Sequence, residues 1–295
     1  MDRRQFLAGL SLAALAGCAR VAPGATPTAV VSSATGSLGV GTDGTAVGDV
    51  MSALFVTALG AHRVAASPLK APGALDQVVP AMVSGRVQVL PVFAASLLAA
   101  LAPGDEPPAP DEVATSLATL LDPQVVVLRA VGVDGRLSYV TAPGSGLASL
   151  SDLRARTRKA TLIGPEWLAT APDGPAGLKT VYGADFARVE AVADVRERLD
   201  RLRAGSALVG VFRAPEVPPA SGLTVLADPE LLVTSDPQVV LVTPEVAGSD
   251  EAVLAIDGVQ ELLTTDVLAS LAGRVVAGAS ADEVAKGWLA GTRPG

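Results

Sequence analysis

The feature that most constrains the fold is a repeated alternation of short apolar segments with segments of helical periodicity, which begins at Leu38. In the helical segments apolar residues recur every three or four positions, as they do from Val47 to Ala58. We expect strands at residues 38–41, 63–67, 87–93, 124–130, 137–142, 160–164, 187–192, 207–213, 223–227 and 239–243. We expect helices at residues 45–59, 75–84, 94–101, 111–121, 150–158, 175–182 and 194–204. This alternation predicts an α/β fold with largely parallel strands.

Two sets of these units follow one another, and residues 250–289 then have a mostly helical pattern with expected breaks at Gly258, Gly273 and Gly278. No repeat of fixed period is present in the sequence. Two α/β blocks with a late return of the chain suit a molecule with a hinged cleft between two lobes.

The first eighteen residues have the anatomy of an export signal. Arg3 and Arg4 precede the apolar run 7–16, which is shorter than the roughly 20 residues that span a bilayer. Leu-Ala-Gly-Cys at 15–18 resembles a bacterial lipobox, which predicts a lipid on Cys18, and the arginine pair resembles a twin-arginine signal. The alternative is a buried N-terminal helix with a buried cysteine. Residues 19–37, rich in Ala, Pro, Thr and Ser, are expected to form a flexible tether.

Charge and rare residues exclude several classes of function. The net charge is −8, and removal of Asp2, Arg3 and Arg4, which together carry +1, would make the mature chain −9. Such a chain is not attracted to nucleic acid or to an anionic lipid surface. Cys18 and His62 are the only cysteine and histidine, so we expect no disulfide, no metal site, no cofactor and no catalytic triad.

Two short motifs invite an enzymatic interpretation that the rest of the chain does not support. Residues 39–44 satisfy G-x-G-x-x-G, but no acidic residue follows at the spacing that a dinucleotide site requires. We interpret this segment as a loop that brings backbone N–H groups to a ligand cleft, or alternatively as a simple tight turn. Residues 67–70 match S-x-x-K without its companion motifs, and no G-x-S-x-G occurs. The sequence therefore predicts no enzyme and no catalytic residue.

Several blocks in the second half of the chain carry a family resemblance. They are Leu-Ser-Asp-Leu at 150–153, Gly-Pro-Glu-Trp at 164–167, Pro-Asp-Gly-Pro-Ala-Gly-Leu-Lys-Thr-Val-Tyr-Gly at 172–183, Leu-Arg-Ala-Gly at 202–205, Leu-Leu-Thr-Thr at 262–265 and Ala-Asp-Glu-Val-Ala-Lys-Gly-Trp-Leu at 281–289. In order and spacing they resemble the substrate-binding subunits of ABC importers for glycine betaine, choline and related osmoprotectants. The resemblance covers nearly everything after Leu38, and the block at 172–183 is its most specific part.

The resemblance implies a periplasmic-binding-protein-like fold of type II, with two α/β lobes joined by two crossing strands. The first lobe would comprise residues 38–137 and 239–295, and the second lobe residues 138–238. Tyr139 would lie in the first crossing and residues 238–243 in the second.

The resemblance also implies a cage of aromatic rings around a quaternary ammonium group, but aromatic residues make up only 3% of this chain. The first loop departs from the family at 44–47, residues 90–95 keep the ring of Phe93 but not a tyrosine hydroxyl, and an expected aromatic residue is replaced at 234–236. For Phe93 and Phe212 simple core packing is the alternative role. The candidate ligand-binding residues are Asp43, Thr45, Phe93, Tyr139, Phe212, Arg213 and Asp236.

The sequence therefore predicts a lipid-anchored, extracytoplasmic solute-binding protein, monomeric, that captures a small betaine-like solute and delivers it to an ABC permease in the membrane. Its contact with the membrane would be through the lipid alone. One alternative is an envelope scaffold or signalling lipoprotein that keeps this fold and binds a protein partner. Another is an exported hydrolase.

Overall fold

The computed structural model describes residues 36–70, 74–104, 108–109, 111–128, 132–205 and 208–292. The chain divides into two units, Met1–Gly36 and Ser37–Gly295, and the second contains all the secondary structure described below. The predicted signal, Cys18 and almost all of the predicted tether lie outside the described residues. Within the described part of the chain, no helix combines the length and the apolar character needed to cross a membrane.

The first lobe is built on a five-stranded mixed sheet. Its strands are β1 (Leu38–Thr42), β2 (Ala66–Lys70), β3 (Val89–Phe93), β4 (Val126–Leu128) and β10 (Gln238–Val242). They lie in the order β2-β1-β3-β10-β4, with β1 parallel to β2 and β3 and with β10 antiparallel to β3 and β4. Strand β10 follows the second lobe in the chain, so it enters the first sheet from the end at which the other strands leave it.

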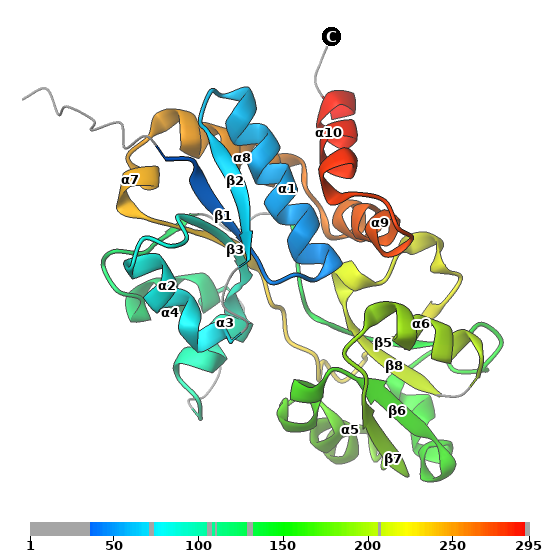
Figure 1. The fold of residues 1–295 in the computed structure, drawn as a ribbon. Helices are drawn as coiled ribbons and strands as arrows, with labels where there is room; N and C mark the ends of the chain where they lie inside the picture. The colour runs from blue at the N-terminus through cyan, green and yellow to red at the C-terminus, as the bar shows by residue number, and fades with distance from the viewer. Residues whose placement is uncertain are drawn as a thin grey trace, which may run out of the picture. The chain divides into compact units, whose positions relative to one another are not determined.

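Helices from both ends of the chain surround this sheet. They are α1 (Ala46–Ala61), η1 (Leu75–Gln77), α2 (Val78–Val83), α3 (Ala94–Leu101), α4 (Val113–Leu120), α7 (Pro244–Ala247), α8 (Asp250–Leu262), α9 (Thr265–Val276) and α10 (Ala281–Thr292). Helix α1 is the centre of the larger core, and its Leu54, Phe55 and Leu59 are completely buried. The C-terminal helices α8, α9 and α10 pack against α1, the first helix of the described residues (Figure 1).

The second lobe is built on another mixed sheet. Its strands are β5 (Leu137–Thr141), β6 (Thr161–Gly164), β7 (Arg188–Ala191), β8 (Val209–Arg213) and β9 (Thr224–Val225), in the order β7-β6-β8-β5-β9. Strand β6 is parallel to β7 and β8, whereas β5 is antiparallel to β8 and β9. The helical segments are η2 (Leu150–Ala155), η3 (Thr157–Lys159), η4 (Glu166–Thr170), α5 (Pro175–Tyr182), α6 (Val195–Arg203), η5 (Ala214–Glu216) and η6 (Pro219–Ser221).

Two crossing segments join the lobes, and they pair with each other. Asp134 forms an antiparallel bridge with Pro237, and the N–H of Gly135 donates to the carbonyl oxygen of Asp236 at 2.8 Å. We define the first crossing segment as residues 133–136 and the second as residues 234–237. Tyr139 and residues 238–243, which we expected in the crossings, lie instead in β5 and around β10, because their ladder hydrogen bonds are made inside the individual sheets.

The predicted α/β class, the largely parallel strands and the two-lobed architecture are confirmed, with two corrections. In each sheet four strands run in one direction, and only β10 in the first sheet and β5 in the second run against them. The helix expected at residues 150–158 consists of two short 3₁₀ segments. Gly258 and Gly273 lie inside α8 and α9, and the break between these helices occurs at Thr264, whose hydroxyl caps α9 by accepting from the Val267 N–H at 3.3 Å. A single glycine costs a helix only about 1 kcal/mol, which tertiary packing offsets.

Candidate functional site

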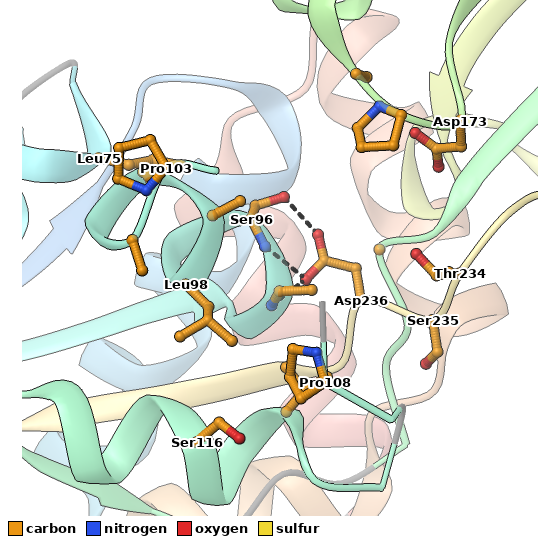
Figure 2. A pocket seen from close by; sticks show the side chains of 18 of the residues that line it. Leu75, Ser96, Leu98, Pro103, Pro108, Ser116, Asp173, Thr234, Ser235 and Asp236 are labelled. Atoms are coloured by element: carbon orange, nitrogen blue, oxygen red, sulfur yellow. Dashed lines mark hydrogen bonds between the residues drawn. The ribbon is translucent and has the colours of Figure 1, made fainter. Parts of the chain in front are cut away.

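A cavity of about 1080 Å³ lies between the two lobes and beside both crossing segments. The first lobe contributes a mainly apolar wall from η1, α3, α4 and the segments that join them. This wall includes Leu75, Leu98, Pro103, Pro108 and Val113. The crossing segments and the second lobe contribute the charged groups. Figure 2 shows Asp236 close to Ser96, with Asp173, Thr234 and Ser235 on the opposite side of the view from Leu75, Leu98 and Pro103. The first-lobe wall of the cavity is thus mainly apolar, and the charged groups lie on the opposite wall.

Asp236 of the second crossing segment caps helix α3 of the first lobe. Its Oδ1 accepts from the backbone N–H groups of Ala95 at 2.8 Å and Ser96 at 3.2 Å, and its Oδ2 accepts from the Ser96 hydroxyl at 2.5 Å (Figure 2). The residue before the helix, Phe93, provides no side-chain cap of its own. A carboxylate at this position satisfies N–H groups that have no partner inside the helix, and it complements the positive end of the helix dipole.

Arg213, the last residue of β8, reaches from the second lobe to this capped helix. Its Nη1 donates to Asp236 Oδ2 at 2.9 Å and to the carbonyl oxygen of Gly135 at 3.1 Å, and its Nη2 donates to the Ser96 hydroxyl at 2.8 Å. The Arg213 and Asp236 side chains are only 19% and 10% exposed. A single guanidinium therefore contacts the first lobe and both crossing segments.

Two aromatic rings lie against the same guanidinium. The Arg213 Cζ is 4.9 Å from the centroid of the Phe93 ring and 5.2 Å from the centroid of the Trp167 ring. Phe93 ends β3 in the first lobe, whereas Trp167 belongs to η4 in the second lobe and is 44% exposed. Gly135 lets the first crossing segment approach Phe93, because a Cβ at this position would lie 2.3 Å from Phe93 Cδ1.

Asp173 brings a second carboxylate to the cavity wall. Burial raises the pKa of Asp173, and a backbone hydrogen bond and the charge of Arg213 offset only part of that effect. Among the described residues no other side chain donates a hydrogen bond to this carboxylate. The Tyr139 hydroxyl donates instead to the backbone carbonyl of Asp173, and burial, followed by the charges of Asp173 and Asp228, raises the pKa of Tyr139. Tyr139 therefore positions the Asp173 segment without lining the cavity itself.

Asp43 and Thr45 form a local cap at the start of α1. Asp43 Oδ1 accepts from the Thr45 N–H at 2.9 Å and from its hydroxyl at 2.7 Å, and Thr45 Oγ1 accepts from the Gly48 N–H at 3.0 Å. Neither residue lines the cavity. Gly44 has a positive φ of 79° and donates to Thr42 Oγ1 at 3.0 Å, so residues 39–44 match the tight-turn alternative.

Phe212 packs in the core of the second lobe and not at the cavity. It is completely buried, and the guanidinium carbon of Arg198 lies 4.7 Å from its ring centroid. Arg198 is held there by Glu216, whose Oε2 is 3.1 Å from Arg198 Nη2. The structure thus brings together Arg213, Asp236 and Phe93 among the predicted residues, and it places Phe212 elsewhere.

The sequence-based search missed Ser96, Trp167 and Asp173. The signal for the last two was present, since both belong to the blocks that carried the family resemblance, and Trp167 is one of only two tryptophans. Ser96 had no signal, because its role depends on Asp236 140 positions later. Within the described residues, no cluster of His, Cys, Asp and Glu side chains could hold a metal ion.

Comparison with known proteins gives a family match over most of the chain. The sequence profile of the substrate-binding domain of ABC-type glycine betaine transport systems (OpuAC) matches residues 38–291. No curated protein gives a significant match.

Solved structures of low sequence identity share the fold. A glycine betaine/carnitine/choline ABC transporter structure superposes with a TM-score of 0.73 at 16% identity and covers 86% of this chain and 97% of its own. Apo YehZ from Escherichia coli superposes with a TM-score of 0.66 at 16% identity and covers 86% of this chain and 98% of its own. Lactococcal OpuAC in its closed conformation with glycine betaine superposes with a TM-score of 0.58 at 15% identity and covers 86% of this chain and 95% of its own.

Proposed function

The chain belongs to the family of substrate-binding domains of ABC-type glycine betaine transport systems, and from this premise we propose that it captures a small quaternary ammonium solute between its two lobes. Proteins of this family are the extracytoplasmic solute-binding components of ABC importers for osmoprotectants, and they deliver their solute to a membrane permease. The family is one of transport proteins and not of enzymes. Glycine betaine and choline are the solutes to test first.

The observation that carries the proposal is the presence, on one cavity wall, of an aromatic face and of a carboxylate to which no described side chain donates a hydrogen bond. A quaternary ammonium group has no N–H to donate, so it is held by ring faces and by opposite charge. Trp167 offers a partly exposed ring, and Asp173 offers a carboxylate that no other described side chain neutralises by a hydrogen bond. A bound cation would stabilise the ionised form of Asp173, whose pKa burial raises.

The size of the cavity supports a binding step that includes closure. Its volume of about 1080 Å³ slightly exceeds the range of about 300–1,000 Å³ for pockets that bury drug-sized ligands. A solute of only a few heavy atoms would touch both walls only after the lobes approach each other. A ligand that contacts both lobes shifts the equilibrium toward the closed state.

Calorimetric titration of the purified protein with glycine betaine and with choline tests the proposal. We expect binding to wild type and a loss of affinity of about tenfold or more for Trp167→Ala and Asp173→Asn. Asp185→Asn is the matched control, because Asp185 is exposed and paired with Lys179 away from the cavity, and it should bind as wild type does. Absence of binding of any quaternary ammonium compound at millimolar concentration would rule out this ligand class.

We further propose that the protein is exported and anchored by a lipid on Cys18, with residues 19–37 as a tether. The mature protein would be a monomer, with residues 38–137 and 239–295 in one lobe and residues 138–238 in the other. The strands of each sheet fall within these ranges, apart from the end residues Leu137 and Gln238, and this supports the boundaries. Mass spectrometry of the membrane fraction should show acylated Cys18, and Cys18→Ser should release the protein from the membrane. Sedimentation should give a single species with the mass of one chain.

A further inference from the structure

The place between Phe93 and Trp167 is filled by a positive charge that belongs to the protein itself. Ring faces attract cations whose centres lie within about 6 Å of the ring centroid, and the Arg213 guanidinium lies within that distance of both rings, at 4.9 and 5.2 Å. One ring comes from each lobe. A cation held by both rings therefore contacts both lobes, which is also what a ligand that favours closure must do.

The guanidinium is fixed in this place by polar contacts. Arg213 is paired with Asp236 at 2.9 Å and also donates to Ser96 and to the carbonyl oxygen of Gly135. Asp236 is in turn held by the N-terminus of α3, so the negative charge that pairs with Arg213 cannot move freely. The arginine has a preorganised site of its own at the position where an aromatic pair would hold a ligand cation.

We propose that Arg213 is an internal competitor for cationic ligands and thereby lowers the affinity of the cleft for quaternary ammonium solutes. This inference rests on the proposed function and adds to it the residue that tunes affinity. Two cations cannot share the space between the two rings, and like charges at this separation repel each other. A ligand cation enters the pair only in the fraction of molecules whose guanidinium has moved away. The apparent dissociation constant is the intrinsic constant divided by that fraction.

Choline is the appropriate probe, because it carries the quaternary ammonium group without a carboxylate that could pair with the displaced arginine. Arg213→Gln removes the charge and keeps a side chain that can donate to Ser96. We expect it to bind choline about tenfold more tightly than wild type in calorimetric titration. Because Arg213→Gln also leaves Asp236 without its partner, circular dichroism and urea unfolding should accompany the titration.

The matched control is Arg136→Gln. Arg136 lines the same cavity, but its guanidinium pairs with Asp134 at 2.6 Å and lies over neither ring. A general increase in negative potential would tighten choline binding equally in both variants, which would overturn the proposal. Tightening confined to Arg213→Gln supports it.

A second variant keeps the test decisive if Arg213→Gln does not fold. Arg213→Lys retains the charge but lacks the planar fork that stacks on rings and bonds to Asp236, Gly135 and Ser96 together. It should be a weaker competitor and bind choline more tightly than wild type. If Arg213→Gln does not fold, unchanged or weaker choline binding by Arg213→Lys would overturn the proposal. If wild type binds quaternary ammonium solutes and neither Arg213 variant is tighter, this inference alone fails. If wild type and all variants bind none of them, the proposed function fails as well.

Discussion

The carboxylate of Asp134 accepts the backbone N–H of Asp236 at 2.9 Å, so each crossing segment holds the other in position. The same carboxylate accepts from the Ser235 hydroxyl at 3.0 Å and from the Arg136 N–H at 2.8 Å. On the first-lobe side, the Asp134 N–H donates to Thr265 Oγ1 at 2.9 Å. One side chain thus organises the connection between the lobes.

Asp134→Asn should destabilise the protein by about 1–3 kcal/mol at neutral pH, because a charged acceptor of several hydrogen bonds is lost. Burial alone would raise the pKa of Asp134, but the hydrogen bonds from Asp236, Arg136 and Ser235 lower it below its ordinary value. The stabilisation is therefore present above about pH 4, the unfolded-state pKa, and is lost as the pH falls through the lower folded-state pKa. Urea unfolding at several pH values should show wild type and variant converging in acid. Asp282→Asn, which removes an exposed pair with Lys286, should change little.

Gly135→Ala should displace the Phe93 ring. The added Cβ would lie 2.3 Å from Phe93 Cδ1, so the ring or the crossing segment must shift, at a cost of about 1–3 kcal/mol. Urea unfolding measures the loss of stability. Because Arg213 lies against the same ring, the emission of Trp167 should also change when it is the only tryptophan, in a Trp288→Phe background. Unaltered stability and emission would contradict the close contact.

Two glycines inside helices should respond oppositely to alanine. At Gly258 in α8 no heavy atom lies within 4 Å of an added Cβ, so Gly258→Ala should stabilise the protein by up to about 1 kcal/mol through helix propensity. At Gly273 in α9 the Cβ would lie 2.8 Å from Pro218 Cγ. Gly273→Ala should therefore be neutral or destabilising, because the added methyl group pushes α9 away from Pro218, the residue before η6. Equal effects of the two substitutions in urea unfolding would show that the Pro218 contact is unimportant.

Tyr182 should titrate well above an ordinary phenol. Burial, followed by its hydrogen bond to Asp228, raises the pKa of Tyr182 to about 12. Its contribution to stability is complete below about pH 10, the ordinary value, and is lost as the pH rises through the folded-state pKa. The chain has two tyrosines, so Tyr139→Phe leaves Tyr182 as the only one and makes phenolate absorbance a direct measurement. The same variant in urea should titrate near pH 10, and a native midpoint at that value would contradict the prediction.

The first and last residues of many helices can be predicted from the residue types at their ends. Helix α5 begins and ends as expected, because Pro175 suits the first helical position and Gly183 adopts the left-handed conformation that ends it, with φ at 64°. The direction of β10 has no local signal. Its antiparallel pairing follows from the path of the chain through the other lobe.

Strand geometry alone separates two of the candidate site residues. Phe212 and Arg213 are consecutive residues of β8, and successive side chains of a strand point to opposite faces. Both therefore could not face the same cavity, and the strand places Arg213 there and Phe212 in the core. The pairing of Arg213 with Asp236 and Ser96 was not predictable, because these residues come from three separate elements that only the complete fold brings together.

The carboxylate that caps α3 also limits how the molecule can bend. Asp236 belongs to a crossing segment, yet leaving the helix would strip Ala95 and Ser96 of their hydrogen-bond acceptor, so this residue must travel with α3 as part of one rigid body. The axis of any opening rotation therefore lies closer to the second lobe. In the second crossing segment, the backbone torsions of Thr234 and Ser235 must change during that rotation.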